Sequence, residues 1–368
     1  MDKKKIRTNN TDNNKKKLNK KSSQKSKLIV VAIAIAVASI GIIGFMTTSA
    51  SENNSEISSS QNLTGNWMDV HGVGVSSATE TNNNKNSLYL ATHNGLFKKD
   101  IGANSSSSSN ASGWVEVGED KSDLMGFTID LSKKGVMYSS GHPQTGGNLG
   151  FRISNDYGVT WQKVSDVTSP TPIDFHTMTV GNNPEIIYAA SGMGDNIFIS
   201  IDGGKNWTTT SPPDGQQVVT LAANKSNSNI LYAGTTNGLF SSQDQGKNWQ
   251  EINNDIVSGN DTMITGIEIS SDGKTAYAFA IPNQADETGN GYIIKSTDGA
   301  KSWTKTSGQI PGSQFVSKFA FDINNGAVYT ALIQDSTETG VASSVYSSSD
   351  DGNSWTLEGT NNDKLLTN

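Results

Sequence analysis

Seven tryptophans recur along the chain at nearly regular intervals, at positions 67, 114, 161, 207, 249, 303 and 355. Their spacings are 47, 47, 46, 42, 54 and 52 residues. A period of about 40–50 residues is typical of chains built from repeated supersecondary units. This repeat therefore constrains the fold more strongly than any other feature of the sequence.

Five of these tryptophans close the pattern S-x-D-x-G-x-x-W or a near form of it, with Ala300 in the Gly place of the fourth copy. The pattern favours a hairpin turn, because the Asp can accept backbone N–H groups of its own turn and the Gly supplies a positive φ. The Trp then buries a large ring against the sheet. The structural Asp and Trp residues of the five boxes are Asp156 and Trp161, Asp202 and Trp207, Asp244 and Trp249, Asp298 and Trp303, and Asp350 and Trp355.

Each unit holds four short apolar or alternating segments and no clear amphipathic helix, which predicts an all-β fold, a β-propeller. Six units run from about 70 to 358, so we expect six blades, with seven as the alternative. The first unit is degenerate, because a serine-rich insertion (103–113) replaces its box before Trp114. Trp67 has no unit before it, and we expect its segment to cover an edge where the ring closes.

The charge is divided unevenly along the chain: residues 1–27 carry +9 and the remainder carries −16. Nineteen uncharged residues follow the basic segment, and as a helix they would span about 28 Å, one hydrocarbon core. The lysines before them indicate that the rest of the chain lies outside a membrane. Cleavage of this segment as a signal peptide, followed by secretion, is the alternative. The predicted division is a cytoplasmic tail, a transmembrane helix, a flexible stalk, the propeller and a short tail, at 1–27, 28–46, 47–62, 63–360 and 361–368.

Composition excludes several classes of function. The chain has no cysteine, so it has no disulfide, no thiol nucleophile and no Cys-ligated zinc. Binding to nucleic acid requires that Lys and Arg neutralise phosphates, and the acidic ring is poorly suited to that. We therefore expect no nucleic-acid partner.

The S-x-D-x-G-x-x-W pattern is the Asp-box, or BNR repeat, and the chain resembles Asp-box propellers from residue 66 to about 358. That superfamily includes sialidases, other glycosidases, sortilin-type receptors and photosystem assembly factors. Four segments further resemble signatures of exported bacterial Asp-box propellers labelled "glycosylhydrolase": Val70-His-Gly-Val, Ala91-Thr-His-Asn-Gly-Leu-Phe, Ser140-Gly-His-Pro and Asp174-Phe-His. The resemblance implies a propeller that binds a glycan or cell-envelope partner, or hydrolyses a glycan.

Sialidase activity is excluded by the scarcity of arginine. Sialidases hold the substrate carboxylate with three arginines, whereas this chain has only Arg7, in the basic tail, and Arg152. The segment Phe151-Arg-Ile-Ser154 is similar to a sialidase motif for three residues, but it leads directly into an Asp-box.

All four histidines are predicted to lie on one face of the ring, in three adjacent blades. Alignment of the first strands places one residue of each blade at the mouth of the central channel: His71, Met125, His176, Val219, Thr265 and Ser317. His93, His142 and Met193 fall in the loops between second and third strands, which share that face. Imidazole suits zinc or copper, and a thioether beside imidazole favours copper. Metal binding, acid–base or ligand contact, and a purely structural role remain three interpretations of this cluster.

Hydrolysis of a glycan needs two carboxyl groups about 5–10 Å apart, one of them with a raised pKa. Asp69 and Asp174 are the candidates for catalysis, because each stands two positions before a mouth histidine that it could orient. Other acids expected on this face are Asp123, Asp195, Asp286, Glu287, Asp335 and Glu338. The leading hypothesis is thus a glycan-binding or glycoside-hydrolase-like propeller; the alternatives are a copper- or zinc-binding surface protein and a non-enzymatic scaffold or assembly factor.

Overall fold

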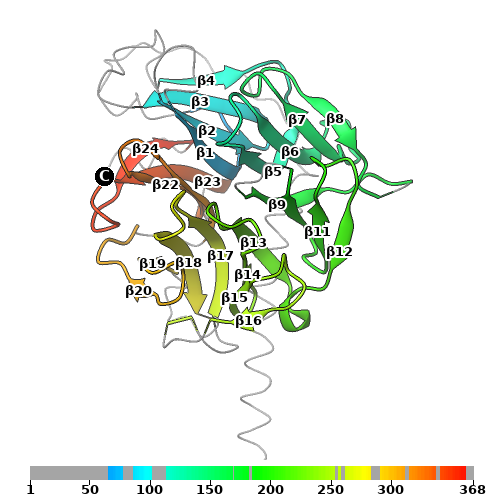
Figure 1. Ribbon diagram of the computed structural model, residues 1–368. Coiled ribbons are helices and arrows are strands. Elements are labelled where there is room, and N and C mark those ends of the chain that lie inside the picture. Colours follow the sequence, from blue (N-terminus) through cyan, green and yellow to red (C-terminus); the bar gives the residue numbers. More distant parts are fainter. Residues whose placement is uncertain are drawn as a thin grey trace, which may run out of the picture.

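A computed structural model describes residues 65–77, 86–101, 113–168, 170–181, 185–252, 256–257, 262–282, 291–310, 315–336 and 340–361. Over these ranges, 24 strands form six antiparallel four-stranded sheets, each made of four consecutive strands. Figure 1 shows the sheets arranged around a centre, with the last sheet beside the first. The fold is a six-bladed β-propeller, as predicted, and not the seven-bladed alternative.

The strands of blades 1 to 3 have the following bounds: β1 (Val70–Ser76), β2 (Asn86–Thr92), β3 (Gly95–Ile101), β4 (Trp114–Val117); β5 (Asp123–Ile129), β6 (Met137–His142), β7 (Phe151–Ser154), β8 (Gln162–Ser165); β9 (Phe175–Val180), β10 (Ile187–Ser191), β11 (Ile197–Ser200), β12 (Thr208–Thr210). Those of blades 4 to 6 are β13 (Val218–Ala223), β14 (Leu231–Thr235), β15 (Gly238–Ser242), β16 (Gln250–Glu251); β17 (Thr262–Ile269), β18 (Ala276–Pro282), β19 (Tyr292–Ser296), β20 (Thr304–Lys305); β21 (Phe315–Phe321), β22 (Val328–Ser336), β23 (Gly340–Ser348), β24 (Thr356–Thr360).

Helix is almost absent from the part of the chain that the structure describes. The one helical element there is a short 3-10 turn, η3 (Pro213–Gly215). No helix in these ranges is long and apolar enough to cross a membrane. The predicted transmembrane segment, 28–46, lies outside the described residues, as do the basic tail 1–27, the stalk 47–62 and residues 362–368.

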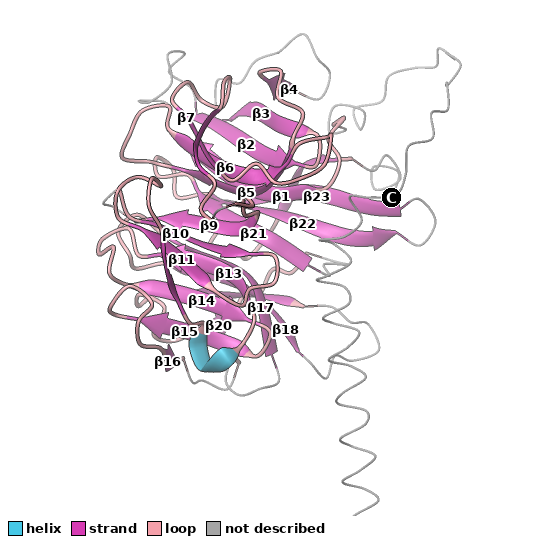
Figure 2. Ribbon diagram, turned by 90° about the vertical axis from the view of Figure 1, so that its right-hand side faces the viewer, coloured by secondary structure: helices cyan, strands magenta, loops and turns pink. Residues whose placement is uncertain are grey.

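The first strand of each blade is the innermost, and it contacts the first strands of the neighbouring blades; β21 contacts β1 and so closes the ring. Inner strands such as β2 and β5 are buried along their whole length, whereas the outer strands β12 and β20 are largely exposed. The apolar runs of the sequence therefore become the inner strands. Figure 2 shows the ring from the side, with strands in magenta and the short helical turn in cyan.

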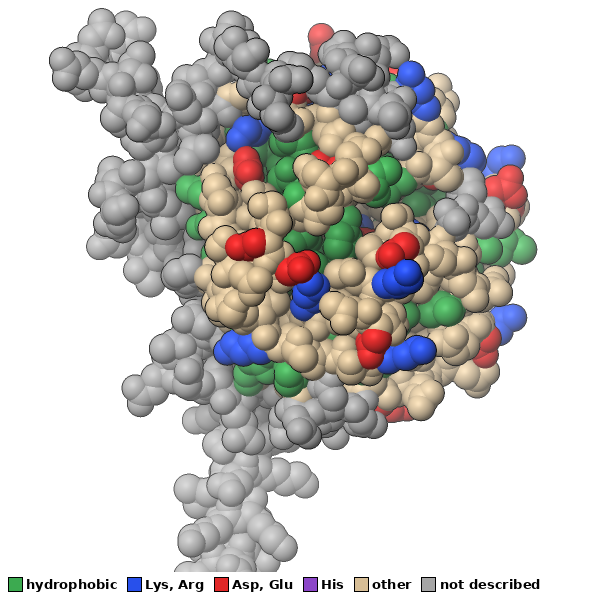
Figure 3. Space-filling view, turned by 60° about the vertical axis from the view of Figure 1, so that its left-hand side comes forward, with side chains coloured by type: hydrophobic (Ala, Val, Ile, Leu, Met, Phe, Trp, Pro, Cys, Tyr) green, Lys and Arg blue, Asp and Glu red, His purple; other side chains and the backbone are tan. Residues whose placement is uncertain are grey.

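The hydrophobic core lies mainly between adjacent blades. One cluster joins Leu96 of blade 1 to Leu124 and Phe127 of blade 2. Another joins Leu90 of blade 1 to Tyr329 of blade 6, across the point where the ring closes. On the face shown in Figure 3, acidic and basic side chains are interspersed rather than gathered by sign.

Each Asp-box is a turn closed by its own side chains. In blade 3 the Ser200 hydroxyl donates to Asp202 Oδ1 (2.9 Å) and accepts the N–H of Gly204 (2.8 Å). The same carboxylate accepts the backbone N–H of Asn206 (2.9 Å) and its side-chain amide (2.7 Å). These two bonds from Asn206 lower the pKa of Asp202 to about 2. The equivalent serine–aspartate bond occurs in the other four boxes, at Ser154, Ser242, Ser296 and Ser348.

The two central residues of each box both have positive φ, for example Gly203 (75°) and Gly204 (87°). Positive φ at two consecutive residues is unstrained for glycine and costs energy for a residue with a Cβ. The sequence pattern predicts the second of these positions and misses the first. Ala300, which replaces the glycine in blade 5, adopts the same left-handed conformation (φ 63°).

The Asp-box turn packs against the preceding blade. A Cβ built on Gly204 in blade 3 would lie 2.0 Å from Cε1 of Phe151 in blade 2. The neighbouring Trp207 packs edge-to-face against the same Phe151 ring, with 5.2 Å between the ring centroids. Its indole N–H donates to Ser165 Oγ of blade 2 (3.1 Å). The box thus sets how closely two blades approach.

Blade 1 lacks an Asp-box, and its contact with blade 6 uses tryptophans instead. Trp67 packs edge-on against Trp114 (5.0 Å between ring centroids), and the Trp114 indole donates to the Glu358 carbonyl of β24 (3.4 Å). The Gly65 N–H donates to the Thr360 carbonyl at the end of β24 (2.9 Å). The expectation that the Trp67 segment covers the closing edge is confirmed.

Two adjacent glycines test whether the Asp-box sets the spacing between blades. Gly203→Ala and Gly204→Ala each place a side chain at positive φ, which costs about 1–2 kcal/mol. Only Gly204→Ala drives a Cβ into the Phe151 ring; nothing lies within 4 Å of a Cβ on Gly203. We expect Gly204→Ala to lower the free energy of unfolding by about 1–3 kcal/mol more than Gly203→Ala. Urea unfolding of both variants measures the difference, and equal losses would contradict the interpretation.

Candidate functional site

A cavity that opens to solvent lies at one mouth of the central channel. Its wall includes one residue from the first strand of every blade: His71, Met125, His176, Val219, Thr265 and Ser317. These are the six residues that the alignment of first strands places at the channel mouth.

A β-bulge explains why these six side chains reach the channel. In every blade the pairing of the first and second strands shifts at the mouth residue, which is left out of the regular register; in blade 2, Leu124 is left out as well. In blade 5, for example, Ile264 pairs with Ala280 and Gly266 with Phe279, so Thr265 is extra. A bulge bends the strand and redirects the extra side chain. The same local irregularity, repeated six times, builds the rim of the cavity.

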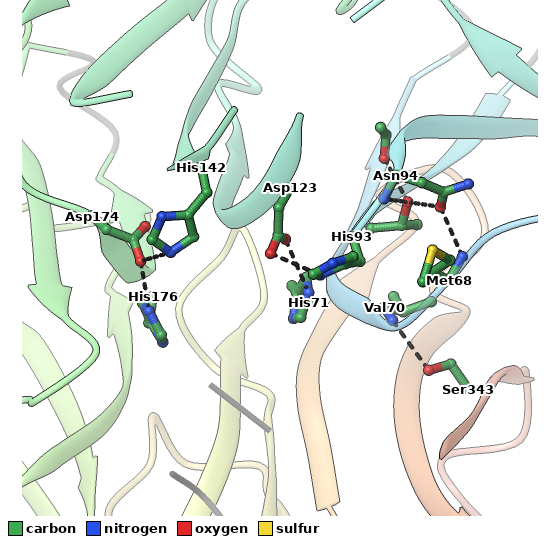
Figure 4. A network of polar contacts seen from close by, with 12 residues as sticks. Met68, Val70, His71, His93, Asn94, Asp123, His142, Asp174, His176 and Ser343 are labelled. Carbon is green, nitrogen blue, oxygen red and sulfur yellow. Dashed lines mark hydrogen bonds and ion pairs between the residues drawn. The ribbon is translucent and has the colours of Figure 1, made fainter. Parts of the chain in front are cut away.

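Three residues from blades 1 and 2 form a first cluster, which we call triad 1: His71 of β1, His93 of the β2–β3 turn and Asp123 at the start of β5. His71 Nε2 lies 3.1 Å from Asp123 Oδ1, and His93 Nδ1 lies 2.8 Å from Asp123 Oδ2. The two imidazoles thus flank one carboxylate, as Figure 4 shows. The His71 and Asp123 side chains are 6 % and 11 % exposed, and that of His93 is 26 % exposed.

A second cluster, triad 2, comes from blades 2 and 3: His142 at the end of β6, Asp174 before β9 and His176 within β9. His142 Nε2 and His176 Nε2 both approach Asp174 Oδ2, at 2.9 and 2.7 Å. Asp174 is buried, and its other oxygen, Oδ1, has no hydrogen-bond partner. The second ring nitrogen of His142, Nδ1, lies 2.9 Å from the Gly147 carbonyl, to which it can donate.

The two triads follow one rule and lie side by side. In each, the aspartate where the first strand of a blade begins contacts the histidine that follows or ends the second strand of the preceding blade. Asp123 of triad 1 and His142 of triad 2 are direct cross-strand partners between β5 and β6. The four histidines are therefore divided into two neighbouring groups, each with its own carboxylate (Figure 4).

Electrostatics within the triads favour imidazolium–carboxylate pairs in the metal-free protein. The hydrogen bond to Asp174 raises the pKa of His142 to about 9. The hydrogen bond to Asp123 likewise raises the pKa of His93. Burial would raise the pKa values of Asp123 and Asp174, but contacts with their two histidines outweigh it and lower both.

Asp69 behaves differently from these two aspartates. Burial raises the pKa of Asp69, and the nearby His71 and His93 only partly oppose this effect. Asp69 interacts electrostatically with His71, as expected, but the carboxylate in contact with His71 is that of Asp123, and the Asp69 backbone carbonyl accepts the N–H of His93 (3.0 Å). The bulge between Val70 and Gly72 breaks the strand alternation that would have put Asp69 and His71 on the same side. The expected pairing of Asp174 with His176 is confirmed.

The remaining predicted residues lie around the triads or outside them. Met125 is buried in the cavity wall, and Met193 is 72 % exposed in the β10–β11 turn. Asp195 accepts a long hydrogen bond from Ser191 (3.4 Å) and joins neither triad. Asp335 lies in β22, while Asp286, Glu287 and Glu338 lie outside the described residues.

Sequence reasoning missed two supporting residues. A Cβ on Gly192 would lie 2.7 Å from the His176 ring, so only glycine fits there. Asn94 accepts the backbone N–H of Met68 (2.7 Å) and donates to the Asn66 carbonyl (3.2 Å), which fixes the turn beside His93. Asn94 could have been noticed because it follows His93 directly in the sequence. Nothing in the sequence marks the contact of Gly192 with His176.

The titration of His142 tests triad 2. We expect a pKa of about 9 for His142 in the metal-free protein, since the Asp174 carboxylate stabilises the charged imidazole. Asp174→Asn removes that charge, so the pKa of His142 should fall toward about 6.5, its value in an unfolded chain. His93 contacts Asp123 instead and should keep its raised pKa. NMR titration of the four imidazoles measures both, and an unchanged His142 in the variant would contradict this assignment.

The same pair predicts how stability depends on pH. The folded-state pKa of His142 lies above its unfolded value, so the pair contributes stability that is complete below about pH 6.5 and is lost as pH rises to 9. The free energy of unfolding of the metal-free protein should therefore fall as pH rises through this window. The Asp174→Asn variant should not show the part of the fall that comes from His142. Urea midpoints measured between pH 6 and 9.5 compare the two proteins.

Comparison with known proteins supports the fold. A family model described as "Sortilin, neurotensin receptor 3" matches residues 150–258. Vacuolar protein sorting/targeting protein 10 of Ajellomyces capsulatus, in two strains, is 31 % identical over 140 residues, which are 34 % of this chain. The chain spans only 9 % of the length of these curated relatives.

Two solved structures have the same fold over 80 % of this chain and 46 % of their own. The GH74 xyloglucanase of Xanthomonas campestris is 15 % identical, with a TM-score of 0.53. The GH74 enzyme of Niastella koreensis is 18 % identical, with a TM-score of 0.52. At such identity the likeness concerns the fold alone. Together with the five closed Asp-box turns and the six-bladed ring, these matches show that the chain is an Asp-box β-propeller.

Proposed function

We propose that this propeller binds transition-metal ions at its channel mouth, one in each triad. The observation that carries the proposal is the donor geometry: each triad offers two imidazole nitrogens and one carboxylate oxygen that all lie within 4.8 Å of one another. Ligands bound about 2.0–2.2 Å from one ion lie about 3–3.5 Å apart, so small side-chain movements suffice.

The hydrogen bonds around the triads support metal binding. His142 Nδ1 lies 2.9 Å from the Gly147 carbonyl, so in the neutral ring Nδ1–H can donate there and leave the Nε2 lone pair for an ion. Ligating histidines commonly donate their second N–H to a carbonyl in this way. His71 Nε2 and Asp123 Oδ1 are buried and 3.1 Å apart, yet neither makes a hydrogen bond of good geometry. An ion between them would satisfy both atoms.

The donor set indicates the class of metal. Two imidazoles and one carboxylate suit zinc or copper, and three protein ligands leave a position open to water or to a molecule in the cavity. A bound ion would hold the imidazoles in their neutral form and take the place of the protons that the metal-free triads bind.

Metal stoichiometry tests the proposal. We expect the full chain, loaded with Zn(II) and desalted, to retain two ions, and we expect Asp123→Asn and Asp174→Asn to retain one each. The double variant should retain none. Asp195→Asn is the matched control, because Asp195 is an acid of the same face outside both triads, and it should retain two. Elemental analysis measures the ratio; a wild-type chain without metal would refute the proposal.

A second candidate is binding or hydrolysis of a glycan, and it is favoured by one observation. Asp69 has a raised pKa, whereas Asp123, close enough to influence it, has a lowered one. A proton donor beside an ionised carboxylate is the combination that glycosidases use. A similar solved structure is that of a xyloglucanase, so xyloglucan and cell-wall polysaccharides are the substrates to test.

The glycosidase hypothesis predicts release of reducing sugar by the full chain. Asp69→Asn should reduce the rate at least about 100-fold, because an amide cannot donate the proton in general acid catalysis. Asp195→Asn should not change the rate. Activity that survives EDTA would attribute the reaction to the carboxyl groups rather than to metal. No release by the wild-type chain would remove this candidate and leave metal binding or a scaffold role.

We also propose that the ring is displayed outside a membrane by residues 28–46, next to a cell-envelope partner, with secretion after cleavage as the alternative. The basic segment 1–27 and the acidic remainder support this orientation. A protease added to intact cells tests it, since only an external ring would be cleaved.

A further inference from the structure

A second cavity lies at the other end of the first strands from the mouth cavity and shares no residue with it. Blades 1, 2, 4, 5 and 6 contribute to its lining, and three of the lining residues are charged: Lys225, Glu268 and Lys318. Lys318 and Glu268 are 9 % and 8 % exposed, so two charges of opposite sign are held almost entirely away from water. Burial of charged groups is costly unless partners compensate them, which makes the partners of these residues informative.

The carboxylate of Glu268 is only partly compensated. Its Oε1 lies 3.4 Å from Lys225 Nζ, but no described residue donates a hydrogen bond to this buried atom. Lys225 Nζ instead donates to the Val180 carbonyl at the end of β9 (2.8 Å). Buried carboxylate oxygens normally accept a hydrogen bond, so Glu268 Oε1 is an acceptor available to a donor from outside the chain.

The ammonium group of Lys318 is also short of partners. It donates to the Phe127 (3.1 Å) and Met178 (2.9 Å) carbonyls, and the described residues offer no acceptor for the third of its N–H groups. Glu268 and Lys225 both lie close enough to influence the pKa of Lys318, and burial lowers that pKa to about 8. The buried cation therefore lacks compensating negative charge, which a bound anion would supply.

The whole lining defines the ligand further. Its charged residues carry one more positive than negative charge, although the ring is acidic. The two aspartates next to it in the sequence are bonded elsewhere, Asp130 to the Tyr138 hydroxyl (3.2 Å) and Asp322 to the Asn86 amide (2.7 Å). The rest of the lining is mostly apolar and includes Ile323, which is 46 % exposed. A small monoanion with a hydrogen-bond donor and an aliphatic part matches this lining.

We propose that this second cavity binds a small aliphatic 2-hydroxycarboxylate. The carboxylate of the ligand accepts from Lys225 and Lys318, its hydroxyl donates to Glu268 Oε1, and its alkyl group contacts the apolar lining. A 2-amino acid has a donor at the same position, but as a zwitterion it carries no net charge and leaves the excess positive charge of the cavity in place. This site is separate from the triads and does not depend on whether they bind metal.

Calorimetric titration of the metal-free full chain with 2-hydroxyisovalerate, isovalerate and valine, which share one alkyl group, tests the proposal. We expect 2-hydroxyisovalerate to bind at least tenfold more tightly than either of the others, because it combines a net negative charge with a donor for Glu268. Lys225→Met should weaken its binding at least tenfold. Lys133→Met is the matched control, because Lys133 is an exposed lysine of the β5–β6 turn outside the cavity, and it should change nothing.

Glu268→Gln gives a readout that a purely structural role of this residue would not produce. The amide lacks the negative charge, so isovalerate should bind at least as tightly as it does to wild type, while the preference for the hydroxy acid should fall to about twofold. A wild-type chain that binds none of the three compounds, or that prefers valine, would overturn the proposal. So would an affinity for 2-hydroxyisovalerate that Lys225→Met leaves unchanged, or an equal preference in wild type and Glu268→Gln.

Discussion

The close approach of each Asp-box turn to the preceding blade is the constraint on which the rest of this structure depends. The turn is closed by its own serine and aspartate, and Gly204 brings its backbone against the Phe151 ring, where no Cβ fits. The other four boxes also contact the preceding blade, although less closely at Gly246 and with a Cβ present at Ala300, so these contacts set the spacing of adjacent blades. The site at the channel mouth has side chains from three blades, so its geometry is only as precise as that spacing.

The six bulges bring side chains from all six blades to the mouth of the channel. Each places one side chain out of register at the rim of the channel, and the residue type then decides what the rim can do. Blades 1 and 3 carry histidine there, blade 2 carries Met125, and blades 4 to 6 carry Val219, Thr265 and Ser317. The chemistry is thus confined to one half of the ring, and the other half forms a wall without titratable groups at these positions.

Much of this arrangement was predictable from the sequence. The tryptophan period gave the propeller and its blade count, the Asp-box gave the turn, and alignment of first strands placed six residues at the channel mouth. The grouping of the histidines was not predictable. Spacing alone pairs Asp69 with His71, but the bulge and the contact between blades assign Asp123 to His71 instead. A contact such as that of Asp123 in blade 2 with His71 in blade 1 depends on how two blades pack together, and the sequence of one repeat does not specify that.

A buried lysine determines how a ligand can reach this site. Lys318 of blade 6 follows the mouth residue Ser317, and its ammonium group donates to the carbonyls of Phe127 (3.1 Å) and Met178 (2.9 Å) in blades 2 and 3. It therefore crosses the channel, and burial lowers its pKa to about 8. The cavity lined by Lys318 shares no residue with the mouth cavity.

The channel is consequently divided, and the mouth cavity is a cup with its floor beside Lys318. An ion or sugar bound at the triads would therefore enter and leave past the rim that the six bulge residues form.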